Sequence, residues 1–407
     1  MKILFITSQV LFPPFSGLRK KIFLFTNELK KCGYKLYLYS FVNFDIKDNQ
    51  IFEEAQFAPF LSKLSFLKNL IFSFFKNPFE IVFYINKKAF INLKVFVERI
   101  KPDLIFIDYL RIAHVFPYVK RNKTILNMDD PQSLKYMNMK KFIKDIENPF
   151  GEAIYSIPSI IRGILKIHFI KSFLLSYEIK MMRKYEKYWS KFFDFVLTNS
   201  EKDKKYLEKN GIKNVILFPP TVKIEEELKI DKKENYLLFV GKMDYAPNPD
   251  AVFYFVKKIF PYVREKFPEI EFWIVGSNVR EDLKGILGKE KNVKVWGAVD
   301  DLETFYKRAI IFVSPLRFGT GIKVKLLEAM QFGAPIVTTP KGAEGIGVED
   351  GKHLLIAKDE KDFARKIIRL LEDKKLSRVL VINAFNFVKE NYEISRVTKK
   401  LLEKILV

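Results

Sequence analysis

The sequence has very little cysteine and histidine, with one Cys and three His among 407 residues. The single thiol, Cys32, excludes an intramolecular disulfide. Because it follows two lysines at an expected helix end, we interpret it as a small buried side chain rather than a reactive thiol. None of the His has a metal-ligand spacing to Cys or to paired carboxylates. The sequence therefore predicts neither a disulfide scaffold nor a bound metal ion.

A long apolar run is also missing. Spanning a bilayer takes about 20 consecutive apolar residues, and the best candidate, Ile154 to Ile179, is interrupted by basic side chains such as Arg162 and Lys171. The run Met1 to Ile6 is too short for a signal peptide and leads into a proline and glycine turn, so we expect a first strand there. These patterns predict a cytoplasmic protein.

Acidic residues are in deficit. The chain has 48 Asp and Glu against 71 Lys and Arg, a formal net charge of +23. Such an excess attracts polyanions, either nucleic acid or an anionic lipid surface. No nucleic-acid-binding signature accompanies the charge, so nucleic acid is not an expected partner.

The placement of the charge favours a lipid surface. The segment Tyr155 to Trp189 interleaves isoleucine and phenylalanine with lysine and arginine, a mixture typical of helices at a membrane interface. The alternative is an amphipathic core helix with a solvated basic face. A second aromatic and basic patch, Phe57 to Phe83, supports the first hypothesis weakly. One hypothesis is thus a cytoplasmic protein that associates peripherally with the inner face of the cell membrane.

Alternating strands and helices dominate the first half of the chain. A helix is predicted over Leu18 to Lys31, ending at Gly33. Strands are predicted at Lys2 to Thr7, Lys35 to Phe41, Asp103 to Ile107, Lys123 to Asn127 and Phe193 to Thr198. This alternation indicates a parallel sheet covered by helices. Pro219-Pro220 and the charged run Lys223 to Asn235 mark a linker.

A second alternation follows the linker. Strands are predicted at Tyr236 to Val240, Glu271 to Val275, Val293 to Trp296, Ile310 to Val313 and Ile336 to Thr339. Helices are predicted from Asn248 with Pro249 at the first position, from Glu281, from Asp301, and over Lys361 to Glu372, Leu376 to Asn391 and Ile394 to Leu406. This is the pattern of a doubly wound domain, in which ligands bind outside the carboxyl ends of the strands.

The segment Ser314 to Met330 carries the most information in this second half. Pro315 ends the preceding strand, and Gly319 and Gly321 allow a tight turn close to a ligand. Thr320 is then placed to cap the next helix, whose unsatisfied N–H groups favour an anion. The alternative is an ordinary strand-to-helix turn of any α/β protein.

Charged residues support the anion hypothesis. Arg317, Lys323 and Lys325 add full positive charges beside the turn. Further into the helix, Glu328 is placed on its exposed surface to accept hydrogen bonds from a vicinal diol such as a ribose. The segment therefore predicts a cradle for a nucleoside diphosphate.

These residues resemble the donor-site signature of family 4-type glycosyltransferases of the GT-B fold (glycosyltransferase group 1). The match is to the bacterial sugar transferases with a Pro-Leu-Arg-x-Gly-Ser-Gly-Ile-(Arg/Lys)-x-Lys-x-x-Glu-Ala-Met pattern. Three further segments resemble the same family: Leu238 to Ala251, Gly333 to Gly345 and the N-terminal loop Pro13 to Arg19. Lys242 stands where many relatives have Arg.

The resemblance implies an α/β protein with two Rossmann-like, doubly wound domains facing a central cleft. Residues 1–220 would form the acceptor domain and residues 221–390 the nucleotide-sugar donor domain. Residues 391–407 would form a helix that crosses back to the N-terminal domain.

The resemblance also implies roles for individual residues. The catalytic candidates that it implies are Lys325, Arg317 and Lys242, and Asp108 is added from its position after a strand, where many relatives have a His. The donor-binding candidates are Gly17, Gly241, Gly276, Ser277, Gly297, Ala298, Val299, Phe318, Gly319, Thr320, Gly321, Ile322 and Glu328. The acceptor-side candidates are Arg19, His114 and Asp130. From position alone, Asp108 and Asp130 are either acceptor bases or strand-end caps.

The function implied is transfer of a sugar from a nucleoside-diphosphate sugar to a glycan or lipid-linked acceptor, with retention, in surface polysaccharide or glycolipid biosynthesis. No cofactor or obligatory metal is expected. Two alternatives stay open: a nucleotide-sugar epimerase of the same fold, and a nucleic-acid-binding protein motivated by charge alone.

Overall fold

The computed structural model describes residues 1–11, 17–44, 50–61, 69, 76–119, 123–141, 143, 168–224, 227–228 and 233–406, with the backbone alone at 17–19 and 168. The chain divides into two compact units. Unit 1 comprises Met1–Pro219 and Thr398–Val407, and unit 2 comprises Pro220–Val397. The loop 12–16, most of 62–75 and the first part of the basic aromatic segment, 155–167, lie outside the described residues.

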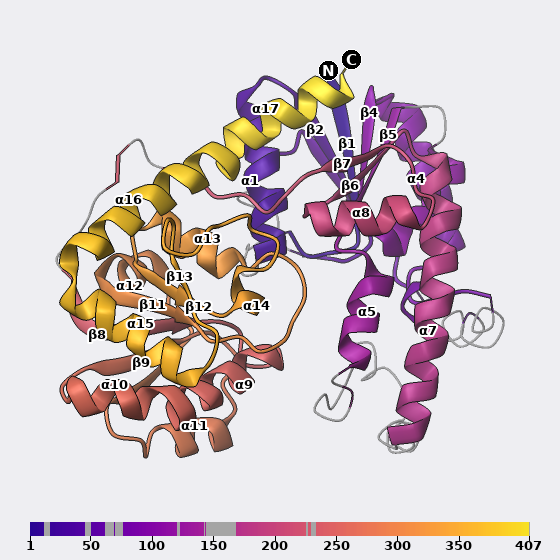
Figure 1. Cartoon of the computed structure of the whole chain (residues 1–407). Coiled ribbons are helices and arrows are strands. Elements are labelled where there is room, and N and C mark those ends of the chain that lie inside the picture. The colour runs from indigo at the N-terminus through magenta and orange to yellow at the C-terminus, as the bar shows by residue number, and fades with distance from the viewer. Residues whose placement is uncertain are drawn as a thin grey trace. The chain divides into compact units, whose positions relative to one another are not determined.

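Unit 1 is built on a parallel sheet of seven strands in the order β3-β2-β1-β4-β5-β6-β7 (Figure 1). The strands are β1 (Lys2–Thr7), β2 (Lys35–Ser40), β3 (Glu54–Phe57), β4 (Leu104–Asp108), β5 (Lys123–Asp129), β6 (Phe195–Thr198) and β7 (Val215–Leu217). The central strands are buried apolar runs, as parallel sheets covered on both faces require. The edge strands β3 and β7 were not predicted, because β3 is only half-buried and β7 has three residues.

Helices flank this sheet. They are α1 (Gly17–Lys31), α3 (Phe79–Val82), α4 (Lys87–Ile100), η1 (Leu110–Tyr118), α5 (Gln132–Lys140), α7 (His168–Trp189), η3 (Ser190–Phe192) and α8 (Glu201–Lys209). Gly33 follows α1 with φ +82°, a conformation that favours glycine and ends the helix as predicted. The prediction for Cys32 was wrong, because its side chain is exposed at this helix end rather than buried.

Two buried carboxylates attach α7 to neighbouring helices. Glu186 accepts hydrogen bonds from the backbone N–H of Ser133 (2.9 Å) and from its hydroxyl (2.5 Å), at the start of α5. Glu178 accepts from the backbone N–H of Phe79 (2.8 Å), at the start of α3. Each carboxylate thus meets helix N–H groups that have no partner inside their own helix. Burial raises the pKa of both glutamates to about 7.

Unit 2 is built on a parallel sheet of six strands in the order β10-β9-β8-β11-β12-β13. The strands are β8 (Glu234–Val240), β9 (Glu271–Val275), β10 (Val293–Gly297), β11 (Ala309–Ser314), β12 (Ile336–Thr338) and β13 (Leu355–Ile356). The helices are α9 (Pro247–Tyr254), the π-helical η4 (Phe255–Ile259), α10 (Phe260–Lys266), α11 (Glu281–Leu287), α12 (Leu302–Arg308), α13 (Val324–Gln331), α14 (Pro340–Ala343), α15 (Glu360–Glu372) and α16 (Lys374–Asn391). The last helix, α17 (Ile394–Ile405), begins in unit 2 and continues into the part of unit 1 that starts at Thr398. Helix α9 begins at Pro247, so the predicted placement of Pro249 at the first position was wrong.

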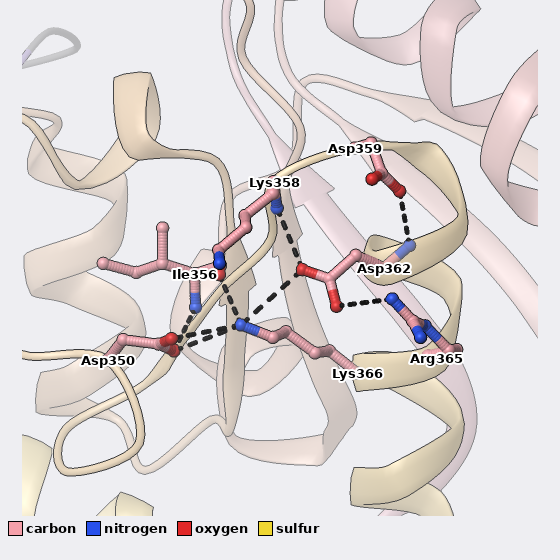
Figure 2. Close-up of polar contacts among 7 residues, drawn as sticks. All are labelled: Asp350, Ile356, Lys358, Asp359, Asp362, Arg365 and Lys366. Carbon is pink, nitrogen blue, oxygen red and sulfur yellow. Dashed lines mark hydrogen bonds and ion pairs between the residues drawn. The ribbon is translucent and has the colours of Figure 1, made fainter.

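Side chains rather than an apolar run fix the unpredicted strand β13. The carboxylate of Asp350 accepts from the backbone N–H of Ile356 (2.7 Å), and the ammonium of Lys366 lies 3.1 Å from Asp350 (Figure 2). Lys366 also donates to the carbonyl of Ile356, so it holds both sides of the short strand. The same cluster starts α15, where Asp359 accepts from the N–H of Asp362 (2.8 Å) as an N-cap.

Among the described helices, none combines the length and the apolar character needed to cross a bilayer. Helix α7, which carries basic and aromatic residues, has its inner face buried in the unit 1 core, and its exposed residues are described below.

A close backbone contact explains one glycine at the end of β9. Gly276 has φ +154°, and a Cβ at this position would lie 2.0 Å from the carbonyl oxygen of Gly241. Its backbone N–H donates to the carbonyl of Gly297 (2.7 Å), which joins the ends of β9 and β10. This glycine is required by the packing of the loops themselves.

We expect Gly276→Ala to destabilise unit 2 by about 1–3 kcal/mol or more, because an added methyl group overpacks the backbone. The matched control is Gly285→Ala in α11, where an added Cβ would meet nothing within 4 Å. This change should stabilise the helix by about 0.5–1 kcal/mol. Thermal unfolding of both variants checks the prediction, and equal midpoints for the two would contradict it.

Candidate functional site

The carboxyl edge of the unit 2 sheet gathers the loops that the sequence singled out. Three backbone hydrogen bonds join neighbouring loops: Gly241 N–H to Val275 O (3.0 Å), Met243 N–H to Ser277 O (2.9 Å) and Gly276 N–H to Gly297 O (2.7 Å). The loops after β10, β9 and β8 therefore form a continuous rim, and the glycine loop after β11 follows in the strand order. This edge is where open parallel sheets bind ligands.

The glycine loop has the conformation that its sequence predicts. Gly319 has φ +124° and Gly321 has φ +70°, both in the region that favours glycine. The predicted capping by Thr320 was wrong, because α13 begins at Val324 and its N-cap residue is Lys323. The Lys323 ammonium folds back to donate to the carbonyls of Thr320 (3.2 Å) and Gly321 (2.5 Å), and so holds the turn closed.

Lys325 is the central cation of this edge. Its ammonium donates to Oδ1 of Asn248 (2.8 Å) and lies 4.3 Å from the centre of the Phe239 ring. Asn248 in turn donates through Nδ2 to the carbonyl of Lys242 (2.7 Å), so one buried amide links α13, α9 and the loop after β8.

Burial, with a smaller contribution from the positive charge of Lys323, lowers the pKa of Lys325 to about 7, while Glu328 opposes the shift. Within the described part of the chain, no carboxylate forms an ion pair with Lys325. A half-buried ammonium that only a neutral amide and a ring face stabilise is unfavourable in its charged form. An anion placed beside it would raise its pKa and hold the proton.

The other two predicted cations already have carboxylate partners. Arg317 is exposed, donates through Nε to Asp250 (2.9 Å) and through a second nitrogen to the same carboxylate, and lies over the Tyr254 ring. Lys242 lies 3.9 Å from Asp244, and both are about half exposed. Either cation has to exchange its partner to meet a ligand anion, whereas Lys325 does not.

Glu328 differs from the sequence expectation. It was expected to lie on the exposed helix surface, but only 9% of it is exposed. The hydroxyl of Tyr306, on α12, donates to its Oε2 at 3.2 Å. The carboxylate is therefore oriented by a buried tyrosine, which suits a residue that has to meet a ligand in one geometry.

The remaining donor-side candidates divide by burial. Phe318 and Ile322 are buried and contribute to the core beneath the glycine loop, while Ala298 after β10 is exposed. Val299 is partly buried against the same core. Gly17 is the first residue of α1 in unit 1. Positions 298, 319 and 320 are thus exposed or partly exposed at the edge, whereas 318 and 322 are buried.

In unit 1, the carboxyl ends of β1, β4 and β5 place Asp108 in a closed network. The Thr7 hydroxyl donates to one oxygen of Asp108 (3.0 Å) and the Asn127 amide donates to the other (2.9 Å). The side chain has no exposure, and burial raises its pKa to about 6. Both oxygens of Asp108 are thus engaged by side chains from the neighbouring strands.

A buried lysine beside this network was missed at the sequence level. Lys21, on α1, is 1% exposed and donates to Asp129 (3.2 Å) and to Oδ1 of Asn199 (2.7 Å). Its ammonium lies 4.2 Å from the centre of the Phe218 ring. The available signal was helical spacing, since Lys21 precedes the buried Phe25 by four residues on the same helix face.

Asp130 follows β5 and keeps more freedom than Asp108. The Asn199 amide donates to its Oδ1 (2.9 Å), and the side chain is partly exposed. Burial raises its pKa to about 7, and the nearby charges of Asp129 and Asp203 act in the same direction. A partly exposed carboxylate that titrates near neutral pH has the property expected of a general base.

His114 is held by protein partners on both ring nitrogens. Nδ1 lies 2.8 Å from the Tyr185 hydroxyl and Nε2 lies 3.3 Å from the carbonyl of Tyr84. Burial lowers its pKa to about 4, so the ring is neutral at physiological pH. The side chain of Arg19 lies outside the described residues. Over the ranges that the structure describes, no group of three or more His, Cys, Asp or Glu is placed to hold a metal ion.

Comparison with known families identifies the unit 2 sheet and its loops. Residues 234–373 match the sequence model of the family described as glycosyl transferases group 1. These residues form a group 1 glycosyltransferase domain. The match includes the Lys325, Arg317, Glu328 and Asn248 positions, and the whole edge described above therefore belongs to the group 1 domain.

Curated relatives match about half of the chain. A protein of the cps region of Klebsiella pneumoniae is 29% identical over 199 residues, 46% of this chain and 51% of that protein. A Campylobacter jejuni alpha-1,4-N-acetyl-D-galactosaminyltransferase, named for a diNAcBac-PP-undecaprenol-linked acceptor, is 27% identical over 53% of this chain and 60% of its own length. The chain thus spans about half the length of the first of these relatives.

Solved structures extend the likeness to the entire chain. The Anabaena protein HepE, solved in complex with UDP and glucose, has a TM-score of 0.63 at 13% identity, covering 100% of this chain and 99% of that one. TarM of S. aureus has a TM-score of 0.66 at 12% identity, with 100% of each chain covered. At this identity the likeness shows the fold alone, which is GT-B: two Rossmann-like domains, each with its own parallel sheet.

Proposed function

We propose that this protein transfers a glycosyl group from a nucleoside-diphosphate sugar, bound at the edge of the group 1 domain, to a glycan or lipid-linked acceptor. We further propose that transfer retains the anomeric configuration and serves surface polysaccharide or glycolipid biosynthesis. The support for the pathway is the cps-region relative and the relative named for an undecaprenol-linked acceptor. The support for the donor is UDP and glucose in the HepE structure and the site itself.

The observation that carries the proposal is the environment of Lys325. It is held over a ring face by a neutral amide, with a pKa of about 7 and, in the described part of the domain, no carboxylate paired with it. The diphosphate of a donor supplies the missing negative charge, and it gains charge as the sugar leaves. Lys325 is therefore the residue proposed to stabilise the leaving group, with Arg317 and Lys242 joining it when they release Asp250 and Asp244.

The bond changes require different groups at the donor and at the acceptor. The bond between the anomeric carbon and the diphosphate oxygen breaks, and its electron pair leaves with the nucleoside diphosphate. A new bond forms between the same carbon and an acceptor hydroxyl oxygen, which loses its proton. The donor side needs cations and N–H groups, while the acceptor side needs a group that takes a proton.

Glu328 is proposed to accept hydrogen bonds from the ribose hydroxyls. Replacing it with alanine would leave the Tyr306 hydroxyl without a buried partner, which costs about 1–3 kcal/mol of stability. Glutamine keeps an acceptor for Tyr306 and removes the charge. The discriminating variant is therefore Glu328→Gln rather than Glu328→Ala.

We expect Glu328→Gln to weaken UDP or GDP binding by about tenfold, equivalent to about 1.4 kcal/mol, with little change in the unfolding midpoint. The matched control is Glu303→Gln on the exposed surface of α12, which should bind like the parent. Calorimetry with both nucleotides measures the effect. Parental affinity in Glu328→Gln would show that this carboxylate does not meet the nucleoside.

Asp130 is the residue proposed to take the acceptor proton, because Asp108 is fully buried and bridged on both oxygens. A base must be deprotonated to act, so its contribution is absent below a pKa of about 7 and grows as pH rises through that value.

We expect Asp130→Asn to lower kcat by about 100-fold or more while leaving nucleotide affinity unchanged, since general base catalysis contributes about 10²–10⁴-fold. The rising limb of the pH profile near 7 should disappear with it. Nucleotide release in the presence of glycan and lipid-linked acceptors is the assay. An unchanged limb in the variant would remove Asp130 from the chemistry without touching the donor-site proposal.

A further inference from the structure

Helix α7 presents one outward stripe of residues along its whole length. Taking Phe169 as the origin, exposed residues recur at helical spacing on one face of α7: Phe169, Phe173, Lys180, Lys184, Lys187 and Tyr188. Lys191, in the η3 turn that follows α7, is exposed as well and continues this stripe. The opposite face is buried and contains Leu175, Met182 and Tyr185 of the unit 1 core. With 22 residues, α7 is about 33 Å long at 1.5 Å per residue, and its first turns extend beyond the sheet (Figure 1).

The aromatic members of this stripe are unusually exposed. Phe169 is 78% exposed and Phe173 is 64% exposed, both in the first two turns of α7. At the other end, Tyr188 is 55% exposed, and Phe192, in the η3 turn that follows α7, is 42% exposed. Exposed aromatic rings at both ends of a helix that already has a buried face indicate a surface that something apolar covers.

The charge of the stripe has one sign. The two glutamates of α7, Glu178 and Glu186, point inward and cap α3 and α5. Lys180, Lys184, Lys187 and Lys191 point outward, and in the described part of the chain none of the four pairs with a carboxylate. Lys171, which the sequence also suggested for this surface, is only 7% exposed and faces inward.

The stripe combines lysines along the helix with aromatic rings at its ends. Lysine stems lie along apolar surface while their ammonium groups reach anionic groups, and aromatic rings settle at the boundary between headgroups and acyl chains. Each lysine near an anionic lipid surface adds to the attraction. A small acidic ligand would contact only part of a stripe of this length. An anionic bilayer surface is therefore the occupant whose chemistry fits the whole stripe.

We propose that the outward face of α7 docks the protein on an anionic lipid bilayer, with Phe169 and Phe173 entering the headgroup region and the four lysines against lipid phosphates. This inference rests on the proposed function only in that a lipid-linked acceptor places the enzyme at a membrane. The buried face of α7 keeps its core contacts when the helix lies on the surface.

Vesicle flotation of the full chain tests the docking. The wild-type protein should float with vesicles of phosphatidylglycerol and phosphatidylcholine at about 0.01 M salt, but not with phosphatidylcholine alone. Binding should fall at about 1 M salt, where the screening length drops from about 30 Å to about 3 Å. Replacing Lys180, Lys184, Lys187 and Lys191 with Gln should lower partitioning by more than about tenfold, and Phe169→Ser with Phe173→Ser should lower it at both salt concentrations.

The matched control removes the same charge from unit 2. Lys258, Lys284, Lys289 and Lys291 are exposed, and their replacement by Gln should leave vesicle binding near the parental level. An equal loss in this control, or wild-type protein that ignores anionic vesicles at low salt, would overturn the proposal. Binding of single-stranded RNA through the α7 lysines, without vesicle binding, would overturn it in favour of a nucleic-acid surface.

Calorimetry with UDP and GDP in solution separates this inference from the proposed function. The α7 variants should bind nucleotide as the parent does, because α7 belongs to unit 1 and the proposed donor site to unit 2. Protein that floats with anionic vesicles through α7 but binds no nucleoside diphosphate would keep the docking surface and end the glycosyltransferase proposal.

Discussion

The hydrogen bond between Lys325 and Asn248 connects α13, α9 and the loop after β8, and the geometry of the proposed donor site depends on it. One amide accepts from the ammonium on α13 and donates to the carbonyl of Lys242, so it fixes the loop after β8 and the cation together. Gly241 is restricted by the same side chain, since a Cβ there would lie 2.7 Å from Asn248. The loop after β8, Gly241 and Lys325 are therefore held together by Asn248, and their geometry is set before any ligand binds.

Lys21, which is buried, and Lys325, which is half-buried, show how environment separates structure from function. Burial lowers the pKa of Lys21 in unit 1, but Asp129 forms an ion pair with it and opposes the shift. The side chain that accepts a hydrogen bond from Lys325 in unit 2 is instead the neutral amide of Asn248. Removing one partner of a buried ion pair leaves an uncompensated charge, so Lys21 is needed by the fold. Lys325 gains its counter-charge only from a ligand.

The sequence predicted most of this fold because its signals are local. The strand β9 was predicted at the residues where it occurs, since Glu271 to Val275 is a short apolar run between turn residues. The strand β13 was missed because it has two residues, and side-chain bonds from Asp350 and Lys366 to Ile356 hold it rather than an apolar run. The same limit applies to the site. Glycine positions and cations were visible in the sequence, while the burial of Glu328 depends on Tyr306 from another helix.

The most direct test of the central claim is calorimetry of UDP and GDP binding in two buffers of different ionisation enthalpy, at about one pH unit above the Lys325 pKa of about 7. If the diphosphate meets Lys325, one nucleotide binds with net uptake of protons, because the anion raises the pKa of a lysine that is mostly neutral at that pH. The uptake should vanish in Lys325→Met. Binding without proton uptake, or uptake that persists in Lys325→Met, would contradict the account.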